Sequence, residues 1–175
     1  MKITLTELNK LDRPGFTLFV GPVFENSPWI AEAAWTRRPF ENVEQLHAAL
    51  CQIVRSAHYE QQLALIRAHP DLVGRAALAG TLTRESNGEQ ASAGLNALSP
   101  AEIELFQKQN AAYRAKFSFP FVICARLNKK DAILAGFEQR LKNSCAQEAQ
   151  TALDEIFKIA ELRLRDLTGA LTEKM

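Results

Sequence analysis

The chain has 175 residues, 47% of them hydrophobic, and its 21 lysines and arginines nearly balance 20 aspartates and glutamates. The net charge of +1 offers no electrostatic footprint for nucleic acid or an acidic membrane, so a small molecule held by local groups is the expected ligand. Three cysteines without a Cys-x-x-Cys pair argue against a disulfide framework and a zinc knuckle. The composition favours one compact globular domain spanning residues 1–175.

The location expected from the sequence is the cytoplasm. No apolar run approaches the roughly 20 residues that cross a membrane, and the first residues lack the apolar core of a secretion signal. Nucleotide-binding glycine loops, the Gly-x-Ser-x-Gly elbow and the His-Glu-x-x-His zinc motif are also missing from the sequence. Several common enzyme classes therefore lose their support.

Helical periodicity dominates the first part of the chain. Thr4 and Glu7 form a capping box at the start of the first predicted helix. An apolar stripe predicts a helix from Val43 to about Ala57, and a further helix follows until Pro70. Because the residue before a proline is disfavoured in a helix, His69 is predicted to lie at a helix end.

The later part of the chain is also predicted to be helical. Ser99 with Glu102 opens a helix that places one row of side chains on a shared face: Ile103, Phe106, Asn110, Tyr113 and Phe117. Asp131 is expected to cap the next helix, and Ser144 starts a last helix that reaches about Leu167. The sequence predicts an all-α fold with about seven or eight helices.

One stretch, residues 117–125 (FSFPFVICA), has the composition of a strand. Its internal Pro120 makes a central strand improbable, so we expect an extended segment between helices. Such a segment leaves backbone N–H and C=O groups without a ladder partner, and these groups can recognise a flat ring that carries amides. The side chains of Phe119 and Phe121 are expected to belong to the core.

His69 has two interpretations. It could be a histidine whose charged form is favoured by the carbonyls at a helix end, or a proton donor or acceptor at the rim of a pocket. His47, His58 and His69 recur every 11 residues, but Pro70 and the expected helix break near His58 argue against a metal site.

The segment after His69 is rich in glycine and alanine, so its backbone can approach a ligand closely while burying little apolar surface. Ser86 and Glu89 match a capping box, which is the structural interpretation of both residues. Glu89 and Gln90 would then lie at a helix start, where free N–H groups favour an anion. An anionic ligand rich in amides would suit this place.

Arg163 is predicted to lie on the edge of the apolar stripe of the last helix, half-buried and in need of a partner. One interpretation is an internal ion pair with a glutamate. The other is a bidentate clamp on a carboxylate or a urea oxygen of a substrate.

Four separated motifs together resemble the OHCU decarboxylase family, whose members decarboxylate 2-oxo-4-hydroxy-4-carboxy-5-ureidoimidazoline in urate catabolism. The motifs are AHPDLVGR, GTLTRESNGEQASAGL, FPFVICA and ELRLRDL, and the resemblance runs from about residue 5 to residue 168. It implies an all-helical enzyme that forms (S)-allantoin and CO2 without a metal or organic cofactor. The glycine-rich break would then be part of the active site.

The resemblance also implies roles for individual residues. His69 matches the catalytic proton donor, and Glu89 lies close enough to the substrate to take part in catalysis. The positions that match substrate-binding residues are Pro70, Ser86, Gln90, Phe121, Val122, Ile123, Cys124, Ala125 and Arg163. Since some relatives are fused to a hydroxyisourate hydrolase and this chain has no room for one, that enzyme is expected as a separate pathway neighbour.

Two other functions remain open at this point. One is an acid–base lyase of the same fold that acts on another ureido acid. The other is a helical interaction module without catalytic activity, which would expose an apolar groove and tolerate loss of His69. The sequence does not fix the oligomeric state, and a homodimer is among the states considered.

Overall fold

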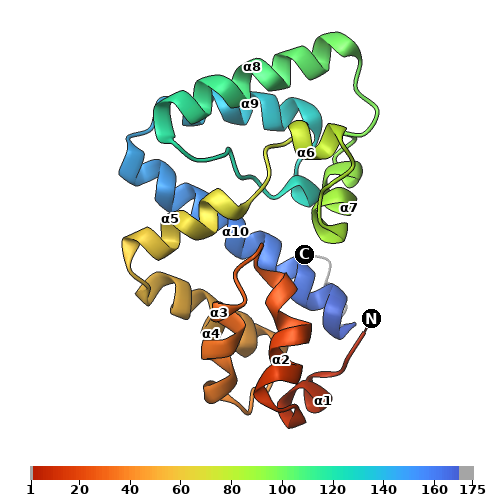
Figure 1. The fold of residues 1–175 in the computed structure, drawn as a ribbon, viewed down its shortest axis with the longest axis vertical. Helices are drawn as coiled ribbons and strands as arrows, with labels where there is room; N and C mark the ends of the chain where they lie inside the picture. The colour runs from red at the N-terminus through yellow and green to blue at the C-terminus, as the bar shows by residue number, and fades with distance from the viewer. Residues whose placement is uncertain (1, 170–175) are drawn as a thin grey trace. The chain divides into compact units, whose positions relative to one another are not determined.

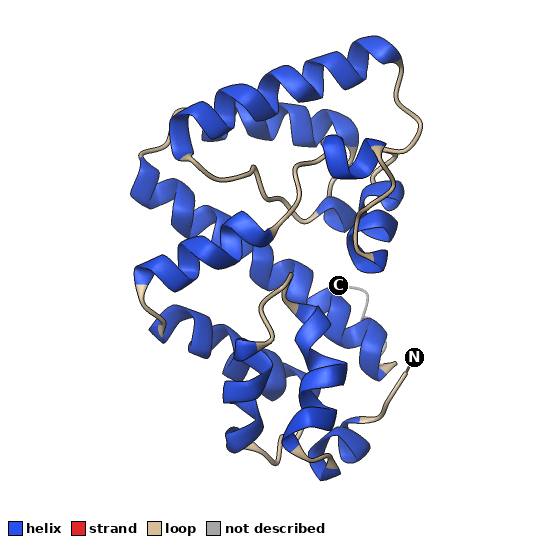
Figure 2. Cartoon of the chain, in the orientation of Figure 1, coloured by secondary structure: helices blue, strands red, loops and turns tan. Residues whose placement is uncertain are grey.

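The computed structural model describes residues 2–169, and within that range every regular element is a helix (Figures 1 and 2). The all-α class is therefore confirmed. The chain folds into two compact units, one formed by residues 1–68 with 157–175 and the other by His69–Ile156. Short helices of four to six residues raise the number of helical segments above the expected seven or eight.

The first unit is built from helices that each bury apolar side chains. They are α1 (Leu5–Lys10), α2 (Arg13–Val20), α3 (Trp29–Ala34), α4 (Val43–Ser56), α5 (Tyr59–Ala68) and the C-terminal part of α10 (Cys145–Thr168), with 3₁₀ turns η1 (Gly21–Val23) and η2 (Trp35–Arg37). On α4, Leu46, Leu50 and Val54 are fully buried, as the apolar stripe predicts. The helix end before Pro70 is confirmed, because α5 stops at Ala68.

The second unit surrounds an extended segment with helices. Its elements are α6 (Arg75–Leu78), α7 (Arg84–Ser92), α8 (Pro100–Phe117), η3 (Ala125–Leu127), α9 (Lys130–Arg140) and the N-terminal part of α10. Ser118, in the left-handed region at φ 62°, ends α8, and the chain then runs extended as far as η3. The predicted extended segment is thus confirmed.

Three of the predicted helix starts are confirmed by hydrogen bonds between a cap and the third helical residue: Thr4 with Glu7, Ser99 with Glu102, and Ser144 with Gln147. The cap predicted at Asp131 is wrong. Helix α9 begins at Lys130, two residues before the start that a cap at Asp131 implies, and its N-cap is Lys129, so Asp131 lies in the first turn. A carboxylate is favourable there because it faces the positive end of the helix dipole.

The core of the second unit is an aromatic cluster around Tyr113. The rings within contact distance of it belong to Phe117, Phe119, Phe121 and Phe137. Three of the partners come from the extended segment and the end of α8, and the fourth comes from α9. Aromatic packing therefore holds a segment that has no strand beside it.

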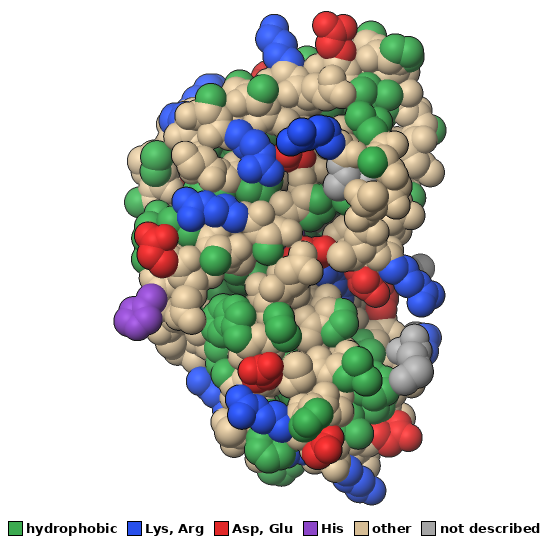
Figure 3. Space-filling model, in the orientation of Figure 1, with side chains coloured by type: hydrophobic (Ala, Val, Ile, Leu, Met, Phe, Trp, Pro, Cys, Tyr) green, Lys and Arg blue, Asp and Glu red, His purple; other side chains and the backbone are tan. Residues whose placement is uncertain are grey.

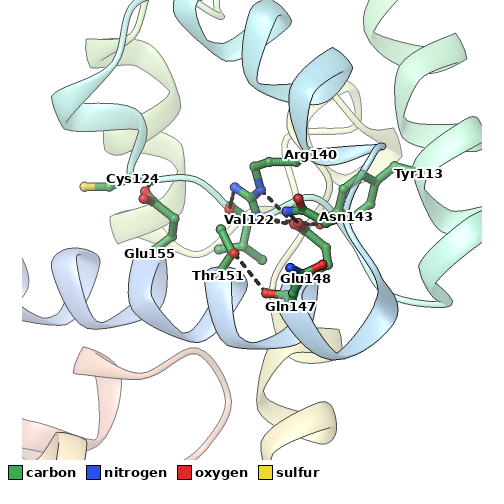
Figure 4. Close-up of polar contacts among 9 residues, drawn as sticks. All are labelled: Tyr113, Val122, Cys124, Arg140, Asn143, Gln147, Glu148, Thr151 and Glu155. Carbon is green, nitrogen blue, oxygen red and sulfur yellow. Dashed lines mark hydrogen bonds and ion pairs between the residues drawn. The ribbon is translucent and has the colours of Figure 1, made fainter.

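Glu148, on α10, carries a carboxylate that is 0% exposed beneath this cluster. It accepts hydrogen bonds from the Tyr113 hydroxyl, from Arg140 Nε at 2.7 Å and from Asn143 Nδ2 at 2.7 Å (Figure 4). Arg140 Nη1 in turn donates to the carbonyl of Val122 at 2.7 Å. Burial and the hydrogen bond to Glu148 raise the pKa of Tyr113, so the phenol stays a neutral donor. The network joins α8, α9 and α10 to the extended segment.

Glu148→Gln is expected to lower the free energy of unfolding by about 3 kcal/mol, since it removes the charge that compensates the largely buried Arg140 guanidinium. Urea unfolding followed by circular dichroism measures this loss. Glu138→Gln, an exposed change on α9, serves as the control and should cost less than about 0.5 kcal/mol. Equal stability of the two variants would contradict the role given to Glu148.

Candidate active site

His69 follows α5 directly and is 7% exposed. Pro70 is half-buried beside it, and a tight turn comes next, closed by a hydrogen bond from Gly74 N–H to the Asp71 carbonyl at 3.2 Å. Val73, inside this turn, has φ 53°. The backbone that carries the histidine therefore leaves the helix through a strained turn rather than a flexible loop.

Side chains from two helices hold this turn. Gln90 Oε1, on α7, accepts a hydrogen bond from Val73 N–H at 3.0 Å. Asn110, on α8, donates to the Leu72 carbonyl at 2.7 Å. Sequence reasoning did not single out Asn110 as a functional residue, although an amide within an otherwise apolar row was a usable signal.

Helix α7 presents the polar residues that the sequence placed near a ligand. The predicted Ser86–Glu89 capping box is wrong, because α7 begins at Arg84 and its N-cap is Thr83, whose hydroxyl accepts from Ser86 N–H at 3.2 Å. Ser86 and Gln90 are instead buried one turn apart on the same face, and Glu89 is half-buried between them. Both residues of the expected box thus lie within the helix.

The backbone of the extended segment is held at two points. Val122 O accepts from Arg140, and Cys124 N–H donates to Glu155 Oε2 at 2.8 Å (Figure 4). Within residues 2–169, no hydrogen bond engages the N–H groups of Val122, Ile123 or Ala125. This arrangement supports the expectation that the segment can offer backbone donors to a ligand.

The side chains of the extended segment have other roles. Phe121 stacks on Phe137 with ring centroids 3.9 Å apart, as expected of a core residue. Burial raises the pKa of the Cys124 thiol, and the carboxylates of Glu155 and Glu89 raise it further. Cys124 is therefore held as a neutral thiol and is a poor nucleophile.

The second unit brings most of the predicted site residues together. Gln90 ties α7 to the turn after His69, and α7 also packs against η3 at the end of the extended segment. The carboxylate of Glu89 lies close enough to Cys124 to influence its pKa. A buried imidazole, a carboxylate, an amide and extended backbone thus belong to one compact unit.

Arg163 lies in the first unit and is buried, not half-buried as predicted. Its Nη1 atom donates to Glu25 Oε2 at 3.1 Å and to the Pro22 carbonyl at 3.2 Å. The internal ion pair with a glutamate, one of the two interpretations of Arg163 given by the sequence, is therefore present in the structure.

The other two histidines have separate surroundings. His47 Nε2, on α4, lies 2.9 Å from the Phe157 carbonyl, and His58 is exposed ahead of α5. Among the described residues, no group of three His, Cys, Asp or Glu side chains is arranged to hold a metal ion. In the same part of the chain, no helix is long and apolar enough to span a membrane. Acidic and basic side chains both appear on the face drawn in Figure 3.

The family model for OHCU decarboxylase matches residues 9–165. A 2-oxo-4-hydroxy-4-carboxy-5-ureidoimidazoline decarboxylase of Haloferax volcanii is 44% identical over 94% of this chain and 96% of its own length. The uric acid degradation bifunctional protein PucL of Bacillus subtilis is 37% identical over 98% of this chain, which covers 33% of PucL. A crystal structure of (S)-allantoin synthase, 30% identical, matches 94% of this chain and 54% of its own with a TM-score of 0.75.

The fold is all-α, and the comparisons identify the family. This chain belongs to the OHCU decarboxylase family.

Arg163→Lys is expected to lower the free energy of unfolding by about 2 kcal/mol, because an ammonium cannot reproduce the guanidinium contacts to buried Glu25 and Pro22. Guanidinium chloride unfolding measures the change. Arg13→Lys is the matched control, since Arg13 pairs with Glu32 at an exposed position and should cost less than about 0.5 kcal/mol. A free Arg163→Lys protein as stable as the parent would show that the ion pair contributes little.

Proposed function

We propose that this protein decarboxylates 2-oxo-4-hydroxy-4-carboxy-5-ureidoimidazoline (OHCU) to (S)-allantoin. The observation that carries the proposal is the link between Gln90 and the turn after His69, which unites a buried imidazole with the polar face of α7. The printed names of relatives across nearly the full chain length agree with this chemistry. The lyase class suits a site that offers acid–base groups and amide donors.

The reaction requires the protein to bind the substrate and to transfer a proton. The bond between the ring carbon and its carboxylate breaks, CO2 leaves, and the electron pair passes into the conjugated ring as an enolate-like system. The neighbouring ring carbon, which bears the ureido group, then takes a proton, and the hydroxyl proton shifts to the ring nitrogen as the hydroxyl becomes a carbonyl of allantoin. Donors on the ring oxygen stabilise the developing charge, and burial of the carboxylate favours its departure. This chemistry needs no metal or organic cofactor.

The site residues around His69 and on α7 each have a role in this proposal. His69 delivers the proton to one face of the ring, and its burial excludes the water that would otherwise protonate either face. Glu89 assists the proton transfer. Ser86 and Gln90 donate hydrogen bonds to the ureido and ring oxygens, and Pro70 lines the site beside His69.

The extended segment and Arg163 complete the proposed set of residues. The unengaged N–H groups of Val122, Ile123 and Ala125 bind substrate oxygens, while Phe121 and Cys124 serve through their backbone. By the resemblance, Arg163 is the proposed anchor of a substrate oxygen, with Glu25 fixing its guanidinium.

The cellular setting is part of the proposal. We place the protein in the cytoplasm. A separate hydroxyisourate hydrolase is the proposed enzyme for an earlier step of the same pathway. A homodimer is the proposed assembly to test first by light scattering. Neither assignment alters the residues required for decarboxylation.

His69→Ala is expected to lower kcat on freshly generated OHCU on the order of 100-fold or more, since the variant lacks the proton donor. Far-UV circular dichroism should stay close to that of the parent. His58→Ala, an exposed change just before α5, is the control and should keep parent activity. A His69→Ala protein that turns over OHCU at the parent rate would show that the imidazole is only structural. A parent that ignores OHCU but cleaves another ureido acid would favour the rival lyase.

Glu89→Gln is expected to lower kcat about tenfold or more while leaving the melting temperature nearly unchanged. The change keeps the shape of a half-buried side chain that is not part of a capping box, so the start of α7 does not depend on its charge. Glu85→Gln, exposed on the same helix, is the matched control. A lower melting temperature with parent kinetics would assign Glu89 to the fold instead.

A further inference from the structure

The turn that follows His69 contains a residue that is unsuited to its conformation. Val73 has φ 53°, a region that β-branched residues rarely enter because Cβ crowds the backbone. Glycine is the usual choice there, yet Gly74 occupies the next position, where an added Cβ would lie 2.7 Å from Asp71 Cβ. Such strain persists only where the surroundings over-determine the backbone, and it is typical of functional sites.

The peptide group between Leu72 and Val73 is held from both of its ends. Asn110 Nδ2 donates to its carbonyl at 2.7 Å, and Gln90 Oε1 accepts from its N–H at 3.0 Å. Both amide side chains are about 6% exposed. Because a peptide cannot rotate without losing both buried hydrogen bonds, these two contacts fix the strained turn.

The contact between Asn110 and Leu72 comes with an unfavourable free-energy term. Its Oδ1 atom is buried and, within the described residues, has no hydrogen-bond partner. A buried acceptor without a partner is unfavourable, and an apolar residue would fit the row formed by Phe106 and Tyr113 on the same helix. The donor to Leu72 is the contact that accounts for an asparagine at this position.

A third contact comes from the next turn of the same helix. Arg114 Nε lies 2.9 and 3.0 Å from the two carboxylate oxygens of Asp71, the first residue of the turn. Asp71, Leu72 and Val73 are thus each bound by one side chain of α7 or α8.

We propose that Asn110 and Arg114, together with Gln90, are positioning residues that clamp the 71–73 turn and thereby aim His69 at the substrate. This inference rests on the proposed function, because it assigns the clamp a purpose in proton delivery. It also separates two tasks of Gln90: Oε1 holds the turn, while the Nε2 donor is the group left for the substrate. A misplaced imidazole slows the chemical step even when the substrate still binds.

The test compares Asn110→Leu with Gln107→Leu, an exposed change on the same helix. Three quantities are measured: kcat and KM on freshly generated OHCU, the melting temperature, and the exchange rate of the Val73 amide by NMR. For Asn110→Leu we expect kcat to fall about tenfold or more with KM changed less than about threefold, and faster Val73 exchange. The control should match the parent in all three.

Arg114→Gln keeps the proposal testable if Asn110→Leu does not fold. The ion pair between Arg114 and Asp71 is partly exposed, so the melting temperature should move by less than about 4 °C. The kcat value, by contrast, should fall about threefold or more. Lys108→Gln, exposed on the same helix, is its control. A merely structural contact would lower stability without altering kcat of the folded protein.

Two results would overturn the clamp: a folded Asn110→Leu protein with kcat within about twofold of the parent, or parent kcat in Arg114→Gln. Failure of the proposed function gives a different result from failure of the clamp, because the parent protein itself would then not decarboxylate OHCU. In that case the Val73 exchange rate still decides whether Asn110 holds the turn, and unchanged exchange in Asn110→Leu would refute it.

Discussion

The buried carboxylate of Glu148 is the constraint on which the second unit depends. A charge that is 0% exposed must be matched by donors, and Tyr113, Arg140 and Asn143 supply them from three different segments. Through Arg140 the same network reaches the carbonyl of Val122. The cost of burying this charge is offset only when all of these donors are in place, so the helices and the extended segment order together.

The extended segment and the turn after His69 both contain backbone polar groups that no helix or sheet pairs. In a sheet, neighbouring strands would satisfy their backbone groups, but a helical unit must use side chains instead. Arg140 and Glu155 do this for residues 122 and 124, and Asn110 and Gln90 do it for the Leu72–Val73 peptide. The result is irregular backbone that side chains fix at these points, which suits a site that must orient a proton donor.

Local signals accounted for most of the fold. Capping boxes at Thr4, Ser99 and Ser144 depend only on residues three apart, and the restriction that Pro70 places on His69 is a property of neighbours. The false capping box at Ser86 had a rival three residues upstream, Thr83, and burial of the Ser86 side chain decided between them. Such a choice depends on tertiary packing, which sequence spacing does not contain.

Long-range partners were beyond sequence reasoning. Arg163 was expected to need a partner, but Glu25 lies 138 residues away, and no local pattern points to it. Asn110 was placed on the correct face of α8, yet its bond to Leu72 depends on a turn that bends in an unusual way. The resemblance to OHCU decarboxylases supplied the site residues that physical patterns alone left ambiguous.

The handedness of the product tests the central claim most directly. If His69 delivers a proton to one face of a bound ring, OHCU treated with the parent protein should give allantoin whose circular dichroism is that of the S enantiomer throughout the reaction. Spontaneous decay of OHCU in the same buffer provides the racemic reference. Racemic allantoin formed at the uncatalysed rate in the presence of the folded protein would contradict the account.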